Sequence, residues 1–575
     1  MSKLDYTTLL KSDPLEGYED PEKFKQWIPK IEKYRENLAK SILPEYSVEL
    51  PKPIDELIEE QFNPLKYLYD EKLLTEKELA ITDSSATDLV AKIAKGEYTS
   101  TEVLKAYAKR ATIAHQFTNC ALEIFIDEGL KRAEFLDEYY KKNGKTIGPL
   151  HGLPISLKEH MNYRGKITHA GYVGHLDNVA KDHGLTSQIL EDLGAVFYVR
   201  TNQPQTLMHL DSNNNIIGLS KNPHNLLLSS GGSSSGEGSI VGFGGSALGV
   251  GSDIGGSIRG PAAFSGCIGL RPTSKRVSLS GGVSAGSGQE SVPAVIGPFA
   301  RSVEDIDLWM KHYINDGKPW VNDASTLPLL WRDVPKPAAK DLTVGVIYDD
   351  GFVKPTPPIQ RALKEVVKKL EAAGVKVVEF KPPKIELAIQ TIHKMYNCDG
   401  NYMQKKHLSA SGEPLVKLTK WNLNYGEGSK DLTVAENRQL NIIRDDLKNE
   451  YTKYLNDNKI DFFISPTYNN VAPQSEGVYN WSYTALWNIL DFPTLVVQTG
   501  IYQDPAVDKW DDGQKNYEYR NQTEQLEHEI YDPEKFKGAP VGIQISGRRY
   551  FDEDVVAAGK TIVEILGTDL FKQYQ

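Results

Sequence analysis

Apolar residues recur at helical spacing through the first part of the chain. Residues 22–43 place them every three or four positions within a polar, proline-punctuated stretch. Residues 99–102 (TSTE) form a capping box, which is typical of a helix start, directly before a second run of this spacing. We therefore predict that residues 1–83 form a helical cap on a main domain of residues 84–575. A lid or a dimerisation arm is the alternative for the cap, so a homodimer stays an open alternative.

The pattern changes to strand spacing after residue 148. A short apolar run at 153–157 predicts a buried strand, and this strand ends in the charge of Lys158. A helix from Thr186 precedes the next apolar strand, at 195–200. Strands that alternate with helices are typical of an α/β sheet protein.

The same alternation continues through the second half of the chain. Residues 342–348, 358–373 and 375–380 predict a strand, a helix and a strand in succession. Further buried strands and a closing helix are expected at 461–466, 492–499, 541–546 and 553–566. The charged residues 502–537 predict a surface insertion without regular structure.

Composition and charge narrow the classes of function. The chain has 575 residues, a net charge of -11 and a pI near 5.7, which argues against a nucleic-acid partner because phosphate binding needs a concentrated basic surface. Its cysteines, Cys120, Cys267 and Cys398, are far apart, so neither a disulfide framework nor a zinc knuckle is expected. The N-terminus carries charges where a signal peptide has an apolar core, and no apolar run is long enough to span a membrane. We predict a cytoplasmic protein that needs no cofactor and no metal.

Glycine is concentrated in residues 229–271. Positions 231–270 hold 14 of the chain's 47 glycines, and apolar residues recur between them. A flexible linker would lack those apolar residues, so we interpret the segment as packed inside the core. Glycine at this density lets the backbone approach a ligand closely. The segment therefore predicts a buried frame for an active site.

Two familiar chemistries fit this segment poorly. A phosphate-binding loop needs a lysine after its last glycine, but Glu237 follows Gly236, and the glycine spacing also misses the dinucleotide-binding motif. A nucleophile elbow, G-x-S-x-G, occurs at Ser234 and at Ser284, two matches that the composition alone explains. A serine triad would also need a histidine, and no spacing distinguishes one. The histidine candidates by position are His151, His160, His169, His209 and His224.

A third chemistry needs no histidine. Burial disfavours the ammonium form of a lysine at the end of a strand, and the neutral amine is then a general base for serine. Lys158, Ser233 and Ser257 form such a set, because each lies beside glycine or an apolar strand. On a strand, His160 would share the face of Lys158 and line the same site.

The sequence GGSSSGEGSIVGFGGSALGVGSDIGGSIRGPAA resembles the signature of the amidase-signature hydrolases through its whole length. The likeness includes LHGLPISLKEH around Lys158, NQPQTLMHLDSNNNIIGLSKNPHN, and WNILDFPTLVVQ and GAPVGIQISGRR nearer the C-terminus, so it covers about residues 86–566. It implies the amidase-signature α/β/α fold. In that fold helices cover both faces of a mixed twisted sheet, here with the N-terminal helical cap added.

The resemblance also implies a role for individual residues. Ser257 is expected to be the acyl-enzyme nucleophile, Lys158 the base, and Ser233 the bridging serine after a cis peptide bond. The expected oxyanion-hole donors are the backbone amides of Ile254, Gly255, Gly256 and Ser257, with the glycines leaving room for the substrate carbonyl.

The resemblance gives four further residues supporting roles. Asp253 and Arg259 are expected to support the reacting residues from behind, with an ion pair that only holds the loop as the compatible alternative, and Ser234 is expected to support the bridging serine by hydrogen bonds. Leu207 matches a substrate-contacting position, with plain core as its alternative. Two departures from the family pattern stand beside these: Ser235 replaces a common glycine, and Glu159-His160 replaces the usual residues after the lysine.

The leading hypothesis is a stand-alone amidase whose partner is a small-molecule amide. It would hydrolyse a monocarboxylic acid amide to carboxylate and ammonia, and the resemblance to fungal acetamidases favours a small, acetamide-like substrate. One alternative is a fatty-acid-amide hydrolase, which would favour an apolar membrane-docking helix that the sequence does not show. The others are the glutaminase subunit of a tRNA amidotransferase and a non-catalytic scaffold of the same fold.

Overall fold

A mixed sheet of 11 strands forms the centre of the protein in a computed structural model, which describes residues 19–424, 430–571 and 574. The strands lie in the order β1-β3-β2-β4-β6-β5-β10-β11-β9-β7-β8. They are β1 (Ala121–Ile124), β2 (Pro154–Lys158), β3 (Val196–Thr201), β4 (Leu248–Asp253), β5 (Ile268–Arg271), β6 (Val295–Ala300), β7 (Thr343–Val346), β8 (Lys376–Glu379), β9 (Phe462–Pro466), β10 (Thr494–Tyr502) and β11 (Pro540–Ser546). β2 is parallel to β3 and β4, and β7 is parallel to β8 and β9. The strands between these two groups pair antiparallel.

Helices lie on both faces of the sheet, as two residues of β10 illustrate. Leu495 packs against Gly559 of α21, whereas the Gln498 side chain donates to a carbonyl of α12 at 3.0 Å. Successive side chains of a strand alternate between faces, so α21 and α12 cover opposite faces. The helices are α2 (Pro21–Lys25), α3 (Ile28–Ser41), α4 (Ile54–Glu59), α5 (Pro64–Asp70), α6 (Glu76–Thr82), α7 (Ala86–Ala94), α8 (Ser100–Thr118), α9 (Ile126–Asn143), α10 (Leu185–Asp192), α11 (Ser235–Phe243), α12 (Arg259–Ser265), α13 (Val303–Asn315), α14 (Pro357–Ala372), α15 (Ile385–Tyr396), α16 (Tyr402–Ser409), α17 (Lys417–Asn424), α18 (Val434–Asp457), α19 (Ser482–Leu490), α20 (Gln522–Glu529) and α21 (Asp552–Leu566).

The elements expected from the apolar pattern are present with shifts of a few residues at their ends. The predicted strand at 153–157 is β2, which is buried along its length and ends at Lys158. The predicted capping box precedes α8, where Thr99 and Glu102 bond each other's backbone amides. The predicted fold class, α/β with a mixed sheet and helices on both faces, is confirmed.

Two expectations about the periphery need correction. The predicted helix at 22–43 is two helices, α2 and α3, separated at residues 26–27. The insertion at 502–537 is more than a surface loop, because it contains α20. Glu524 and Glu527 of α20 are buried, and Glu527 accepts the Asn480 amide at 3.0 Å. The boundary between cap and main domain at residues 83 and 84 stays a prediction.

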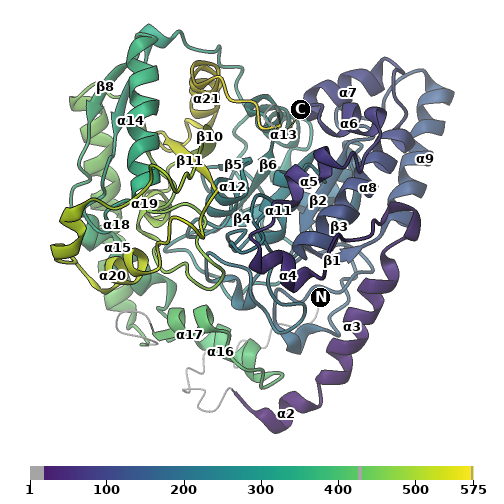
Figure 1. The fold of residues 1–575 in the computed structure, drawn as a ribbon, viewed down its shortest axis with the longest axis horizontal. Coiled ribbons are helices and arrows are strands. Elements are labelled where there is room, and N and C mark those ends of the chain that lie inside the picture. The colour runs from purple at the N-terminus through teal and green to yellow at the C-terminus, as the bar shows by residue number, and fades with distance from the viewer. Residues whose placement is uncertain (1–18, 425–429, 572–573, 575) are drawn as a thin grey trace.

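The glycine-rich segment lies in the middle of the molecule. Figure 1 shows the N-terminal half of the chain, purple to blue, at one end and the C-terminal half, green to yellow, at the other, with β4, β5, α11 and α12 between them. Residues 229–271 fold into these four elements and are almost entirely buried, as the sequence predicted. The segment thus forms a buried frame beside the ends of strands, and the polar residues described in the next section lie there.

Candidate active site

Three segments that are far apart in the sequence meet at one end of the parallel strands. β2 carries Lys158 at its last position, the turn before α11 carries Ser233, and the turn between β4 and α12 carries Ser257. Lys158 Nζ lies 2.8 Å from Ser233 Oγ, within hydrogen-bond distance. Because β2 and β4 are parallel neighbours, both strands end on the same side of the sheet. The structure thus brings together the three residues that the sequence singled out.

Ser233 and Ser257 are connected through the backbone. The peptide bond from Gly232 to Ser233 is cis, as the resemblance implied. The next amide, that of Ser234, donates to the Ser257 carbonyl at 3.1 Å. Both serine side chains line one cavity, and within the described chain Ser257 Oγ has no hydrogen-bond partner. The Ser257 hydroxyl is therefore available to a ligand in the cavity.

Burial controls the protonation of Lys158. Its side chain is fully buried, and loss of water around the ammonium group lowers its pKa from 10.5 to about 7. The negative charges of Asp253 and Glu237 act in the opposite direction and raise this pKa. At neutral pH a large fraction of Lys158 is therefore the neutral amine, which is the form that accepts a proton.

The turn after β4 presents backbone amides beside Ser257. Within the described chain, the amides of Ile254, Gly255 and Ser257 have no acceptor. The Gly256 amide differs, because it donates to Asp253 Oδ1 at 2.8 Å. Of the four predicted oxyanion donors, Gly256 is thus already occupied by a carboxylate, and the other three amides stay free.

The two glycines of this turn are required by packing. A Cβ atom on Gly255 would lie 2.8 Å from the Trp481 ring, and one on Gly256 would lie 2.5 Å from Thr484 Oγ1. Gly256 also has a φ angle of +126°, which residues with a side chain rarely adopt. These glycines therefore let the turn lie against the start of α19, and the expectation that they also make room for the substrate carbonyl stays a prediction.

Two hydroxyl groups hold the carbonyl side of the same turn. Tyr396, at the end of α15, donates to the Ile254 carbonyl at 2.6 Å, and Thr484 donates to the Gly255 carbonyl at 2.6 Å. In a trans peptide the C=O and N–H groups point in opposite directions, so the Gly255 amide faces away from Tyr396. The sequence analysis missed Tyr396 because it lies far from the glycine-rich segment and within no motif.

Asp253 and Arg259 form the ion pair that was the alternative expected for them. Arg259 Nε lies 3.1 Å from Asp253 Oδ2, and both side chains are fully buried. Asn488 of α19 also donates to Asp253, at 2.9 Å. Burial raises the pKa of Asp253, but the Arg259 charge and these hydrogen bonds outweigh it and hold that pKa below its usual range. The carboxylate is thus a fixed anchor for the turn.

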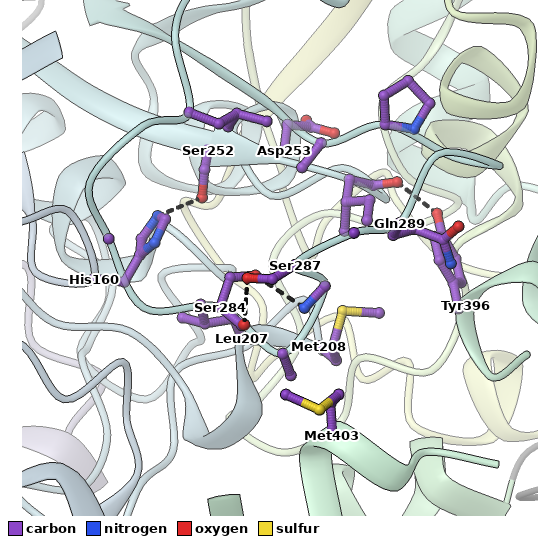
Figure 2. A pocket seen from close by; sticks show the side chains of 18 of the residues that line it. His160, Leu207, Met208, Ser252, Asp253, Ser284, Ser287, Gln289, Tyr396 and Met403 are labelled. Atoms are coloured by element: carbon purple, nitrogen blue, oxygen red, sulfur yellow. Dashed lines mark hydrogen bonds between the residues drawn. The ribbon is translucent and has the colours of Figure 1, made fainter. Parts of the chain in front are cut away.

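Ser252, the residue before Asp253 on β4, is a polar group that the sequence analysis did not single out. Its Oγ lies 3.0 Å from Lys158 Nζ and 2.9 Å from His160 Nε2, and Figure 2 shows the imidazole turned toward it. Ser234 was expected to support Ser233. Its hydroxyl instead bonds the amide and the carbonyl of Ser252, both at 3.2 Å, so Ser234 holds the strand end that carries Ser252.

His160 is the only histidine among the described residues that line the cavity. It follows the end of β2 in a turn, so it does not share the strand face of Lys158 as expected, yet it reaches the same site. Ser284, the second G-x-S-x-G serine, also lines the cavity, where its Oγ accepts the Gly286 amide at 3.0 Å. The remaining histidine candidates, His151, His169, His209 and His224, lie outside the cavity wall.

The cavity has a volume of about 710 Å³ and an apolar side. Leu207 lies in this wall, at the position that the resemblance gave to a substrate contact. Figure 2 shows Met208 and Met403 across the cavity from Ser252. Thr206 and Leu207 have φ angles of +66° and +64°, uncommon for residues with a side chain, which turns this segment toward the cavity. The described residues include neither a group of His, Cys, Asp and Glu side chains that could hold a metal nor a helix able to cross a membrane.

Comparison with known proteins places this geometry in a family. The Amidase family model matches residues 102–556. The acetamidase of Emericella nidulans is 38% identical over 93% of this chain and 97% of its own, and that of Aspergillus oryzae is 37% identical over 86% and 92%. A solved fatty acid amide hydrolase is 66% identical, covers 99% of this chain and 100% of its own, and superposes with a TM-score of 0.96. The chain therefore belongs to the amidase-signature family and is an enzyme that hydrolyses the carbon–nitrogen bond of amides.

Proposed function

We propose that the protein hydrolyses amides of long-chain fatty acids, with Ser257 as nucleophile, Ser233 as bridging serine and Lys158 as base. The observation that carries the choice of substrate is the cavity of about 710 Å³ that contains both serines. Cavities of roughly 300–1,000 Å³ hold ligands of drug size, so a two-carbon acyl group would leave most of this space empty. The fatty acid amide hydrolase at 66% identity supports the same choice.

The proton relay follows from the contacts of Lys158. The neutral amine takes the proton of Ser233 while Ser233 takes that of Ser257, and Ser257 Oγ bonds to the amide carbon. As the carbon–nitrogen bond breaks, the proton returns through Ser233 to the departing nitrogen, which leaves as ammonia or an amine. Water then attacks the acyl-enzyme with the same relay as base, which releases the carboxylate and restores Ser257.

The free amides beside Ser257 provide the charge stabilisation in this proposal. Attack turns the amide carbonyl oxygen into an oxyanion, and the N–H groups of Ile254, Gly255 and Ser257 are the donors with no other acceptor in the described chain. Loss of one such donor typically costs about 10²–10³-fold in rate. The polar contacts of the site thus serve the chemistry, whereas the apolar wall serves the acyl chain.

Acetamide is the second candidate substrate, because two relatives named acetamidase cover most of this chain. Ammonia release by the purified protein, without any partner, separates the candidates across acetamide, butyramide, hexanamide and oleamide. We expect kcat/KM to rise at least about a hundredfold from acetamide to oleamide, because each buried methylene contributes about 0.8 kcal/mol until the cavity is full. A preference for acetamide would contradict the fatty-amide proposal, and a folded protein that hydrolyses none of the four would contradict the amidase mechanism.

A further inference from the structure

Ser252 and His160 form a hydrogen-bonded chain that ends on Lys158. Ser252 Oγ lies 3.0 Å from Lys158 Nζ on one side and 2.9 Å from His160 Nε2 on the other. Ser252 lies on β4 and His160 lies in the turn after β2. Pairing of these two parallel strands therefore keeps the hydrogen-bonded side chains next to one another. All three side chains line the cavity or contact its wall, and none of the roles proposed above uses Ser252 or His160.

We propose that Ser252 and His160 are positioning residues that aim the lone pair of Lys158 at Ser233. This inference rests on the proposed role of Lys158 as base. A neutral lysine amine has two hydrogens and one lone pair. If one hydrogen is bound to Ser252, the lone pair can face Ser233, which lies 2.8 Å away.

The direction of these hydrogen bonds follows from the charged state of Lys158. An ammonium group has only donors, so Ser252 Oγ must accept from it. The single hydrogen of Ser252 then goes to the other partner, and His160 Nε2 has to accept it. His160 therefore carries its own hydrogen on Nδ1, and the ring also has a hydrogen bond to the backbone of Val283. When Lys158 loses a proton to solvent or gains one from Ser233, the Ser252 hydrogen stays on the histidine side.

The electrostatics of the site keep His160 in this accepting form. Burial and the neighbouring Lys158 charge lower the pKa of His160 well below 6.5, so the imidazole is neutral where the enzyme would act. Arg200 of β3 acts in the same direction on His160. The other charged groups that face Lys158 are Asp253 at the end of β4 and Glu237 of α11, and both favour its ammonium form. A charged His160 would donate to Ser252 Oγ, and the direction of these hydrogen bonds would be reversed.

Loss of the acceptor on His160 has a specific consequence. In His160→Leu the Ser252 hydrogen has no partner while Lys158 is charged, which disfavours the ammonium form. When Lys158 is neutral, the same hydrogen can bind its lone pair and block it from Ser233. Both the plateau rate and the pH at which half of it is reached should therefore fall. If His160 only filled space, its replacement by leucine would not lower the plateau rate and the midpoint pH together.

The test compares His160→Leu and Ser252→Ala with His160→Gln, whose amide oxygen can accept the Ser252 hydrogen. Two rates are measured from pH 5.5 to 9.5: oleamide hydrolysis, and labelling of Ser257 by a fluorophosphonate, which needs no amide substrate. We expect plateau values about tenfold or more below wild type in both for His160→Leu and Ser252→Ala, a midpoint shifted to lower pH, and KM changed less than about threefold. His160→Gln should recover most of the lost rate. Ser246→Ala is the matched control, because Ser246 is a buried serine beside β4 that bonds Ser156 N and Leu248 O and not Lys158.

The outcomes separate the two proposals. If wild type is labelled and folded but hydrolyses no amide, the proposed function fails while the labelling rates still test the positioning chain. If His160→Leu and Ser252→Ala keep the wild-type plateau and midpoint, the positioning role is overturned. It is also overturned if folded His160→Gln is as slow as His160→Leu, since the accepting atom would then be irrelevant.

Discussion

The glycine-rich segment 229–271 and the cavity wall formed by residues 279–290 are built in opposite ways. Nearly every residue of the first is buried, and many of its polar groups are held by hydrogen bonds within the segment or from α19. The second is mostly exposed or half-buried, and a few backbone and side-chain bonds, such as those from Val283 N to the His160 carbonyl and from Gln289 Nε2 to the Met395 carbonyl, attach it to the rest of the molecule. A buried, hydrogen-bonded frame can hold reacting groups within a few tenths of an ångström, whereas an exposed wall can change with little cost to the fold. Under the proposed function, reaction type and substrate choice therefore reside in different parts of this molecule.

The largest expected effect separates two serines, one in each region. Ser257→Ala should lower kcat by about a thousandfold or more, because the proposed nucleophile is removed from an otherwise intact site. Ser284→Ala is the matched variant in the wall and should cost less than about tenfold, because Ser284 contacts only its own turn. Ammonia release at saturating oleamide measures both. A large loss in Ser284→Ala with an active Ser257→Ala would reverse the assignment of the two regions.

A substitution in the apolar wall should change substrate choice and spare the chemistry. Met403→Trp, on α16, fills part of the cavity, so kcat/KM for oleamide relative to hexanamide should fall about thirtyfold, within the range that misfitted methylenes produce. Lys406→Trp adds the same bulk to an exposed position of the same helix and is the control. Competition between the two amides in one reaction measures the ratio directly. An equal loss for both amides would show that α16 affects the reacting groups themselves.

The residues of the site differ in how well the sequence alone predicts them. Lys158, Ser233 and Ser257 could be chosen before the fold was known, since their residue types and glycine neighbours carry the chemistry. Ser252 and Tyr396 could not, because their importance depends on which strand lies beside β2 and on which helix reaches the Ile254 carbonyl. Strand order and helix docking are long-range properties, and no spacing in the sequence encodes them.

The same limit applies to the turn after β4. The packing role of Gly255 and Gly256 was not predicted, because the sequence does not show that Trp481 and Thr484 lie against them. The Gly256 amide was expected to be an oxyanion donor because the sequence does not show that the Asp253 carboxylate accepts its hydrogen.

The pH dependence of the hydrolysis rate tests the proposed role of Lys158 without any substitution. The pKa of Lys158 is lowered to about 7, so the neutral fraction should rise from about one-tenth at pH 6 to about nine-tenths at pH 8. The rate of oleamide hydrolysis should therefore increase about tenfold across this interval and level off above it. Circular dichroism over the same interval controls for unfolding. A rate that does not change with pH, or that is higher in acid, would contradict Lys158 as the base.

The smallest expected effect concerns Tyr396, which contacts the glycine-rich segment and also lines the cavity. Tyr396 comes from α15 and lines the cavity, yet its hydroxyl holds the Ile254 carbonyl of the frame at 2.6 Å. Tyr396→Phe keeps the ring and removes that bond, so the Gly255 amide loses orientation and kcat should fall about fivefold, as expected for one hydrogen bond of about 1 kcal/mol. KM should stay within about twofold because the cavity wall is intact.

A matched tyrosine shows whether this effect comes from the turn or from any lost hydroxyl. Tyr451 also donates a buried hydrogen bond to a carbonyl, that of Pro383 at 3.0 Å, but α18 holds it away from Ser257. Tyr451→Phe should reduce stability to a similar degree and leave kcat within about twofold. If both variants lower kcat equally, the loss follows global stability. If only Tyr396→Phe lowers kcat, the glycine-rich segment depends on this one hydrogen bond from α15. Tyr396 would then serve both the reacting groups and the cavity that selects the substrate.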